Sequence, residues 1–194
     1  RVLFRSSGYG AIFKYDINSN NLTYLHKFSG LTYGDGSRPV NSPLIEINGK
    51  FYGSTNFGGL GLGGGNGVIF TCDTNGNYGI IHKFLANDFE GNQCGGLLYA
   101  NDGFIYGINA YGGAQILGNG VLFKSDLNGN VTILHKFSGQ TRSDGELPFG
   151  ILMQASDNKI YGTTYFGGLY NNGTIFRCDT LGNYNVVYHF SGTT

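Results

Sequence analysis

The chain has 194 residues, of which 35 are Gly and 3 are Pro, so little uninterrupted sequence is left for helices of ordinary length. Basic and acidic residues balance at 12 each, which leaves no long-range field to attract nucleic acid or an anionic membrane. The 40% hydrophobic content supports a substantial core and excludes wholesale disorder, and no run approaches the roughly 18 apolar residues of a spanning helix.

Four histidines mark a tandem repeat. They lie 56, 53 and 54 residues apart, and other landmarks recur in step: an acid before glycine, Tyr-Gly, Gly-Gly, Gly-x-x-Phe and a later Asp. The histidines are His26, His82, His135 and His189, and the acids are Asp35, Glu90 and Asp144. Such a period indicates modules that bury their apolar faces against one another.

The array begins part-way through a repeat. Residues 10–13 and Asp16 match the second half of the module, so we expect a half repeat over 1–30 and full repeats over 31–84, 85–139 and 140–194. The half repeat, together with Arg1 in place of an initiator Met, suggests a processed chain or a piece of a longer one.

Each full repeat holds four strand candidates. In the first, Leu44–Ile47 and Phe51–Thr55 flank Asn-Gly, the preferred two-residue hairpin turn, and Val68–Cys72 and Tyr78–Phe84 flank a second turn-forming cluster. The layout recurs in 96–109 with 121–137 and in 151–164 with 174–190. Four short antiparallel strands about every 54 residues predict an all-β fold, a β-propeller or propeller-like array of four-stranded blades.

The three cysteines do not indicate a disulfide framework. Cys72 and Cys178 hold the same place in different repeats, which would keep them apart. Cys94 stands where other repeats have Pro39 and Pro148, so we interpret it as a loop substitution. No catalytic cysteine is predicted, because a nucleophile needs an adjacent base and the only histidines are repeated ones.

The run of His-Lys-Phe-Ser-Gly, an acid with Gly, Tyr-Gly-Thr-Thr, Gly-Gly and Gly-x-Ile-Phe resembles the GloVer tandem repeats of bacterial surface and secreted proteins. The motif positions are His26, Phe28, Asp35, Gly36, Tyr52, Gly53, Gly58, Gly59, Gly67 and Phe70, with their equivalents in later repeats. The resemblance implies propeller-like domains of largely unassigned function, in proteins exported and attached to cell surfaces. An extracellular or cell-surface location is therefore expected.

The second repeat departs from this pattern. It has Leu85 and Ala86 for Ser-Gly, Glu90 for Asp, and Ile108 and Asn109 for Thr-Thr. If these positions bind a ligand, we expect that repeat to be the impaired one.

The repeated polar residues have two interpretations. A histidine that recurs with an acid one connection away favours a structural hydrogen bond, and a ring of four imidazoles holding Zn or Cu is the alternative. The recurrent aspartates open hairpin turns, which they are expected to cap; a calcium loop is the alternative, although the glycine spacing differs from an EF-hand. We predict no cofactor. The aspartates are Asp16, Asp73, Asp126 and Asp179.

The loop between the second and third strands of each repeat combines aromatic rings with amides. The ligand-binding candidates are Asn56, Phe57, Tyr111, Tyr165, Phe166, Tyr170 and Asn171. Flat rings cover the C–H faces of sugars while amides bond hydroxyls, so carbohydrate binding is one interpretation. Packing between blades is the other, since Phe57, Tyr111 and Phe166 hold one repeated position. Tyr165, Tyr170 and Asn171, with Asn172, are not strictly repeated and are the better binding candidates.

These observations predict a non-catalytic surface propeller that binds carbohydrate or protein. The alternatives are a structural subunit that assembles into a ring or filament, and a propeller-type glycan hydrolase or lyase. Three and a half repeats close a small ring only if Val2–Phe4 add a strand; two chains could instead close one of about seven or eight blades. Self-association, or further blades from a longer chain, is therefore expected, because an open blade edge must be covered.

Overall fold

The computed structural model describes residues 8–30, 34–39, 43–59, 65–85, 90–113 and 118–192. Over these residues the chain consists of strands and turns, with one 3-10 turn, η1 (Gln140–Arg142). No helix in the described ranges is long and apolar enough to cross a membrane. The predicted all-β fold is confirmed.

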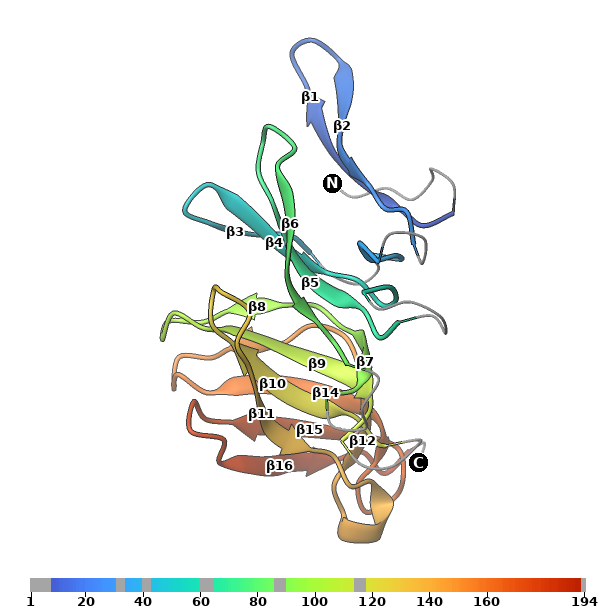
Figure 1. Cartoon of the computed structure of the whole chain (residues 1–194). Coiled ribbons are helices and arrows are strands. Elements are labelled where there is room, and N and C mark those ends of the chain that lie inside the picture. Colours follow the sequence, from blue (N-terminus) through green and yellow to red (C-terminus); the bar gives the residue numbers. More distant parts are fainter. Residues whose placement is uncertain are drawn as a thin grey trace.

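The strands of the described residues form four antiparallel sheets, each built from neighbours in the chain (Figure 1). The first sheet contains β1 (Ala11–Asp16) and β2 (Asn21–Lys27). The second contains β3 (Ile45–Ile47), β4 (Lys50–Ser54), β5 (Val68–Cys72) and β6 (Tyr78–Lys83). The third contains β7 (Asn92–Cys94), β8 (Leu98–Tyr99), β9 (Ile105–Tyr111), β10 (Val121–Ser125) and β11 (Val131–Lys136). The fourth contains β12 (Gly145–Pro148), β13 (Met153–Gln154), β14 (Ile160–Gly167), β15 (Thr174–Cys178) and β16 (Tyr184–His189).

Local turn chemistry explains the hairpins. Asn48 and Gly49 join β3 to β4 with φ angles of 51° and 78°, the left-handed pair of a type I′ turn. Asp73 caps the turn between β5 and β6, because its Oδ1 accepts hydrogen bonds from the backbone N–H groups of Asn75 (2.9 Å) and Asn77 (3.0 Å). The predicted capping role of this aspartate is confirmed, and Asp126 and Asp179 make the equivalent bonds.

The first strand of the third and fourth sheets is divided, which the sequence pattern did not predict. In the fourth sheet β13 pairs with the beginning of β14, whereas β12 pairs with its far end. The backbone departs from a regular strand at Leu147 within β12, with φ 51°, and at Gly150 between β12 and β13, with φ 97°. These segments have two to four residues, so their conformation is imposed by the partner strand rather than by local preference.

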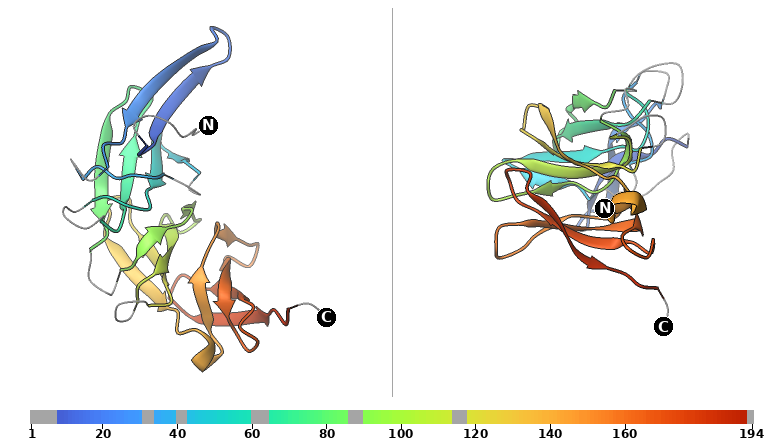
Figure 2. Two further views of the ribbon diagram at one scale, coloured as in Figure 1. Left: turned by 90° about the vertical axis from the view of Figure 1, so that its right-hand side faces the viewer. Right: turned by 90° about the horizontal axis from the view of Figure 1, so that it is seen from below.

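The sheets stack face to face along an open arc, with the first and last sheets at its opposite ends (Figure 2). A separate apolar core fills each of the three junctions. In the first junction, Ile12 and Phe28 from the first sheet pack with Phe70 and Cys72 from the second. Residues 2–4, which could have supplied an extra strand, lie outside the described residues.

Cys94 corrects one expectation. It ends β7 opposite Asn109 and is buried in the second core with Phe84 and Leu97, so its interpretation as a loop substitution is wrong. Burial raises the pKa of its thiol to about 12, which makes it a packing residue rather than a nucleophile. All three cysteine thiols are free and buried.

Candidate functional site

The repeated histidine and acid lie together where one sheet meets the next. At the first junction, His26 Nε2 on β2 lies 3.0 Å from Asp35 Oδ2, in the connection to the second sheet. Tyr78 of β6 stacks on the imidazole with ring centroids 3.7 Å apart, and its hydroxyl donates to the Asp35 carbonyl oxygen. We call this arrangement the junction clasp: a histidine, the acid of the connection and the residue of the next sheet that covers them.

The third junction has the same clasp. His135 Nε2 lies 2.9 Å from Asp144 Oδ2, and Tyr184 stacks on the imidazole at 3.5 Å while its hydroxyl donates to Asp144 Oδ1. Burial raises the pKa of Asp144, but hydrogen bonds from His135, Tyr184 and Ser138 outweigh it and lower the pKa to about 2. At the first clasp, burial lowers the pKa of His26 more than Asp35 raises it. Folding lowers the pKa of both groups, so the folded state binds fewer protons than the unfolded state.

The second junction has a weaker clasp. Glu90 reaches His82 at 3.2 Å, but Val131 replaces the stacking tyrosine and the other ring nitrogen, Nδ1, lies 3.0 Å from the Gly129 carbonyl oxygen. Leu85 contributes its backbone N–H to Glu90 and no hydroxyl, whereas Ser138 contributes both in the third clasp. In the same repeat, the buried Oδ1 of Asn109 has no hydrogen-bond partner among the residues that the structure describes. Of the departures noted in this repeat, Leu85, Glu90 and Asn109 therefore lie together at this junction, since the Asn109 Nδ2 donates to the Glu90 carbonyl oxygen. Ile108 lies in the core of the next junction, and Ala86 lies outside the described residues.

His189 is not the fourth equivalent histidine, and that prediction is wrong. In the fourth sheet, His189 pairs with Thr174. The equivalent pair in the third sheet is Lys136 with Val121, so His189 holds the position of Lys136 and not that of His135. Tyr188 takes the histidine position instead, and it meets Phe190 edge to face as His135 meets Phe137. The repeat runs His-Lys-Phe in the earlier modules but Tyr-His-Phe in the last.

The three clasp histidines belong to three different junctions and do not converge on one axis. Within the described ranges, no group of three His, Cys, Asp or Glu side chains is placed to hold a metal ion. The turn aspartates use their oxygens on their own turns: Asp126 Oδ2, for example, accepts from Asn130 Nδ2 at 2.7 Å. These hydrogen bonds lower the pKa of Asp126.

The clasp predicts acid sensitivity. Because the pKa of Asp144 is about 2 when folded and 3.8 otherwise, its ionised form stabilises the chain above pH 4, and this contribution is lost as the pH falls towards 2. We expect Asp144→Asn to lower the free energy of unfolding by about 2 kcal/mol at pH 7, and by progressively less between pH 4 and pH 2. Urea unfolding across this pH range measures the difference. The exposed Glu46→Gln is the control, expected to change stability by less than about 0.5 kcal/mol. Parallel pH curves for Asp144→Asn and the parent chain would contradict the role given to Asp144.

The aromatic candidates lie on three sheets. Phe57, Tyr111 and Phe166 hold equivalent ladder positions, opposite Ser37, Asn92 and Glu146 respectively. Phe57 is half-buried with the Arg38 guanidinium 5.1 Å from its ring centroid, and the backbone N–H of Asn56 donates to the Arg38 carbonyl oxygen. The Phe57 ring thus lies against the incoming connection, and the structure does not bring the candidates of different sheets together.

The β14–β15 loop, which we define as residues 165–173 so that it includes the last residues of β14, gathers the remaining candidates. Tyr165 and Tyr170 are 66% and 58% exposed, and the Tyr165 ring meets Phe166 edge to face at 4.6 Å. Asn171 has φ 57° and its Oδ1 accepts from the Gly167 N–H at 3.0 Å, which closes the loop. Four of the seven predicted residues therefore lie on one loop of the last sheet.

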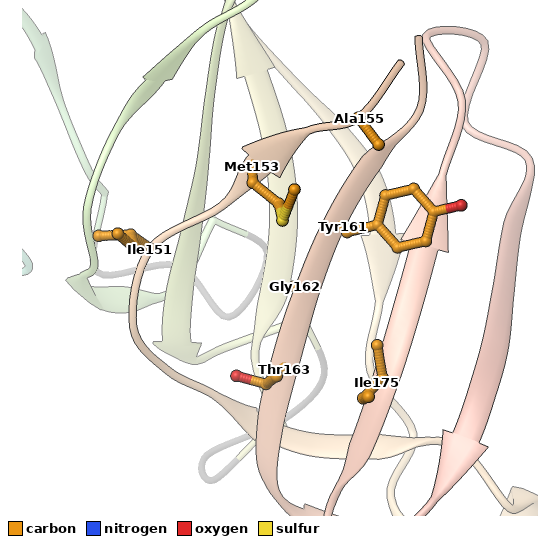
Figure 3. Close-up of a pocket in the computed structure, with 7 residues that line it drawn as sticks. All are labelled: Ile151, Met153, Ala155, Tyr161, Gly162, Thr163 and Ile175. Atoms are coloured by element: carbon orange, nitrogen blue, oxygen red, sulfur yellow. The ribbon is translucent and has the colours of Figure 1, made fainter. Parts of the chain in front are cut away.

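A second feature of the last sheet was missed in the sequence. Its face turned away from the preceding sheets carries an apolar hollow of about 330 Å³ (Figure 3). The hollow is lined by Ile151, Met153, Ala155, Tyr161, Gly162, Thr163 and Ile175. The signal that could have revealed it is that the last repeat has apolar and aromatic residues, such as Tyr161 and Ile175, at the positions of Tyr52 and Ile69.

The geometry defines the class of protein: an all-β, propeller-like repeat protein whose antiparallel sheets are clasped one to the next. The chain belongs to the Gloeobacter/Verrucomicrobia repeat family, whose profile matches residues 4–194, and the predicted GloVer resemblance is confirmed. Among solved structures it is similar to a GH43 β-1,3-galactosidase, with a TM-score of 0.51 and 10% sequence identity. The alignment covers 92% of this chain and 38% of the galactosidase, so at this identity it shows the fold alone. No curated protein is significantly similar in sequence.

Proposed function

We propose that this chain is a non-catalytic binding module, displayed at a cell surface or outside the cell, that uses the β14–β15 loop to bind carbohydrate. The observation that carries the proposal is the exposure of Tyr165 and Tyr170 beside the exposed amides of Asn171 and Asn172. Large exposed rings next to polar groups are typical of recognition surfaces. A protein segment is the alternative ligand for the same loop.

The loop is preorganised for such a role. The Asn171 side chain bonds Gly167, and the Gly168 N–H donates to the carbonyl oxygen of Asp144, in the clasped connection. Holding the loop to the clasp lowers the entropy cost of ordering it on binding. The two tyrosine rings can then cover the apolar faces of sugar rings while the amides bond hydroxyls.

The acids of the clasps support binding without hydrolysis. Glycosidases generally use one carboxylic acid of raised pKa and a second carboxylate free to attack or to activate water. Asp35, Glu90 and Asp144 instead accept hydrogen bonds from their own junctions, and the pKa of Asp144 is lowered rather than raised.

The test is titration calorimetry with a panel of galactose-, glucose- and mannose-containing oligosaccharides. For any that bind, we expect Tyr165→Ala and Tyr170→Ala each to weaken affinity at least about fivefold, since a buried aromatic contact contributes about 1–2 kcal/mol. Tyr99→Ala, a tyrosine of β8 on another sheet, is the control and should leave affinity unchanged. Affinity unaffected by both loop variants would remove the loop from the proposal, and release of free sugar by the purified chain would favour the hydrolase alternative.

A structural role in a ring or filament is the second candidate function. The observation that favours it is the apolar hollow on the outer face of the last sheet, because large exposed apolar patches mark association surfaces.

A further inference from the structure

The hollow on the last sheet is one half of a sheet-to-sheet junction. Ile175 pairs with Tyr188 in the way that Ile69 pairs with His82, and Tyr161 holds the position of Tyr52. In the second sheet, Ile69 and Tyr52 are buried in the core shared with the third sheet. In the last sheet, the equivalent residues line the open hollow.

Phe190, at the edge of this face, is likewise more exposed than its equivalents in the other sheets. Its equivalents Phe28, Phe84 and Phe137 are at most 3% exposed, because each packs edge to face on a phenylalanine of the next sheet. Phe190 is 39% exposed. The last sheet therefore presents the apolar surface that a following sheet covers at every other junction.

The opposite end of the array presents the complementary half. On the first sheet, Tyr15, Leu22 and Tyr24 are exposed. The strand registers match Leu22 and Tyr24 to Tyr78 and Ile80, which in the second sheet pack against the preceding sheet. This face of the β1–β2 hairpin thus has the side chains that would cover a preceding sheet.

The clasp position of the last sheet suits a junction formed without a covalent connection. At the three junctions within the chain, the connection supplies an acid that holds a half-buried histidine. The last sheet has Tyr188 at that position, and a phenol can be buried without a carboxylate partner. The formal net charge of zero means that no overall repulsion opposes contact between copies.

We propose that a second copy of this chain docks its β1–β2 hairpin on the outer face of the last sheet, so that copies associate head to tail. The contact repeats the packing of the internal junctions, with Leu22 and Tyr24 of one copy over Met153, Tyr161 and Ile175 of the other. Because the two faces are different surfaces at opposite ends of the arc (Figure 2), the contact is heterologous and generates a closed ring or a filament. This inference is independent of carbohydrate binding by the β14–β15 loop.

Sedimentation velocity over a concentration series tests the proposal with two single variants. Met153→Glu places a charge in the hollow, and Leu22→Glu places one on the hairpin; both side chains are exposed, at 58% and 44%, so the monomer should remain folded. We expect the parent chain to grow in mass with concentration and each variant to stay monomeric. An equimolar mixture should form a discrete dimer, because each variant keeps the face that the other lacks. Leu181→Glu, in the exposed turn between β15 and β16, is the control and should associate as the parent does.

Three results would overturn the proposal. The parent chain could be monomeric at every concentration, both variants could associate as the parent does, or Leu22→Glu could dimerise while Met153→Glu does not, which would indicate that two hollows meet face to face. Circular dichroism and urea unfolding of the variants separate loss of association from loss of folding. Titrating monomeric Met153→Glu with the oligosaccharide panel separates this inference from the proposed carbohydrate binding.

Discussion

Truncating Phe137 to alanine is expected to lower the free energy of unfolding by about 3–5 kcal/mol. Phe137 is 3% exposed and fills the core between the third and fourth sheets, where its ring lies 5.3 Å from Phe176 and 5.0 Å from His135. The substitution leaves a cavity at a surface shared by two sheets, and neighbouring sheets stabilise one another in a repeat array. Urea unfolding at a concentration where the chain is monomeric measures the loss.

The chain contains its own control for this experiment. Phe190 holds the same repeat position but has no following sheet, so in the monomer Phe190→Ala should cost less than about 1 kcal/mol. Similar losses for the two variants would mean that the repeated phenylalanine acts within its own sheet and not through the junction.

Substituting Gly67 with alanine should cost a comparable amount, about 3–5 kcal/mol, for a different reason. Gly67 has φ 97°, and a Cβ atom there would overlap the carbonyl oxygen of Thr55, the residue that follows β4. The substitution therefore combines left-handed backbone strain with displacement of backbone, which has no flexible side chain to move away. Its N–H also donates to the Gly58 carbonyl oxygen, so a shift would loosen the glycine pair.

Gly103→Ala separates the two causes. Gly103 has φ 83°, but a Cβ atom there would have nothing within 4 Å, so only the strain of about 1–2 kcal/mol remains. Thermal or urea unfolding of both variants gives the comparison. A Gly67→Ala chain that is no less stable than Gly103→Ala would show that the strands can separate at little cost, contrary to the close packing described here.

The clasp and the glycines together explain why the repeat motif has its composition. The acid-glycine pair of each connection lies directly against the glycine pair of the loop between second and third strands: Gly58 against Gly36, and Gly112 against Gly91. The acid holds the preceding histidine while the glycine beside it allows the loop to approach. Most of the recurring residues thus make contacts where one sheet joins the next. The non-repeated tyrosines Tyr165 and Tyr170 take no part in these contacts.

Local sequence signals predicted the repeat, the all-β class and most strands. β5 spans Val68–Cys72 as predicted, and the Asn48–Gly49 turn forms as its residue types require. These features are local: alternation sets which residues face a core, and turn residues set where the chain reverses. The capping aspartates were predictable for the same reason, because each acts within five residues of its own chain.

The packing of the sheets, which is non-local, sets which residues hold equivalent positions and which faces stay open. Counting histidines placed His189 in the series, although the phenylalanines Phe84, Phe137 and Phe190 are spaced 53 apart and give the correct alignment. A bulge beside each histidine position, on the same strand, sets the register, and bulges depend on cross-strand pairing that spacing does not reveal. Ile69 and Ile175 likewise match in sequence, but whether each side chain is buried depends on whether a second sheet packs against it. A following sheet covers Ile69, whereas Ile175 lines an open hollow.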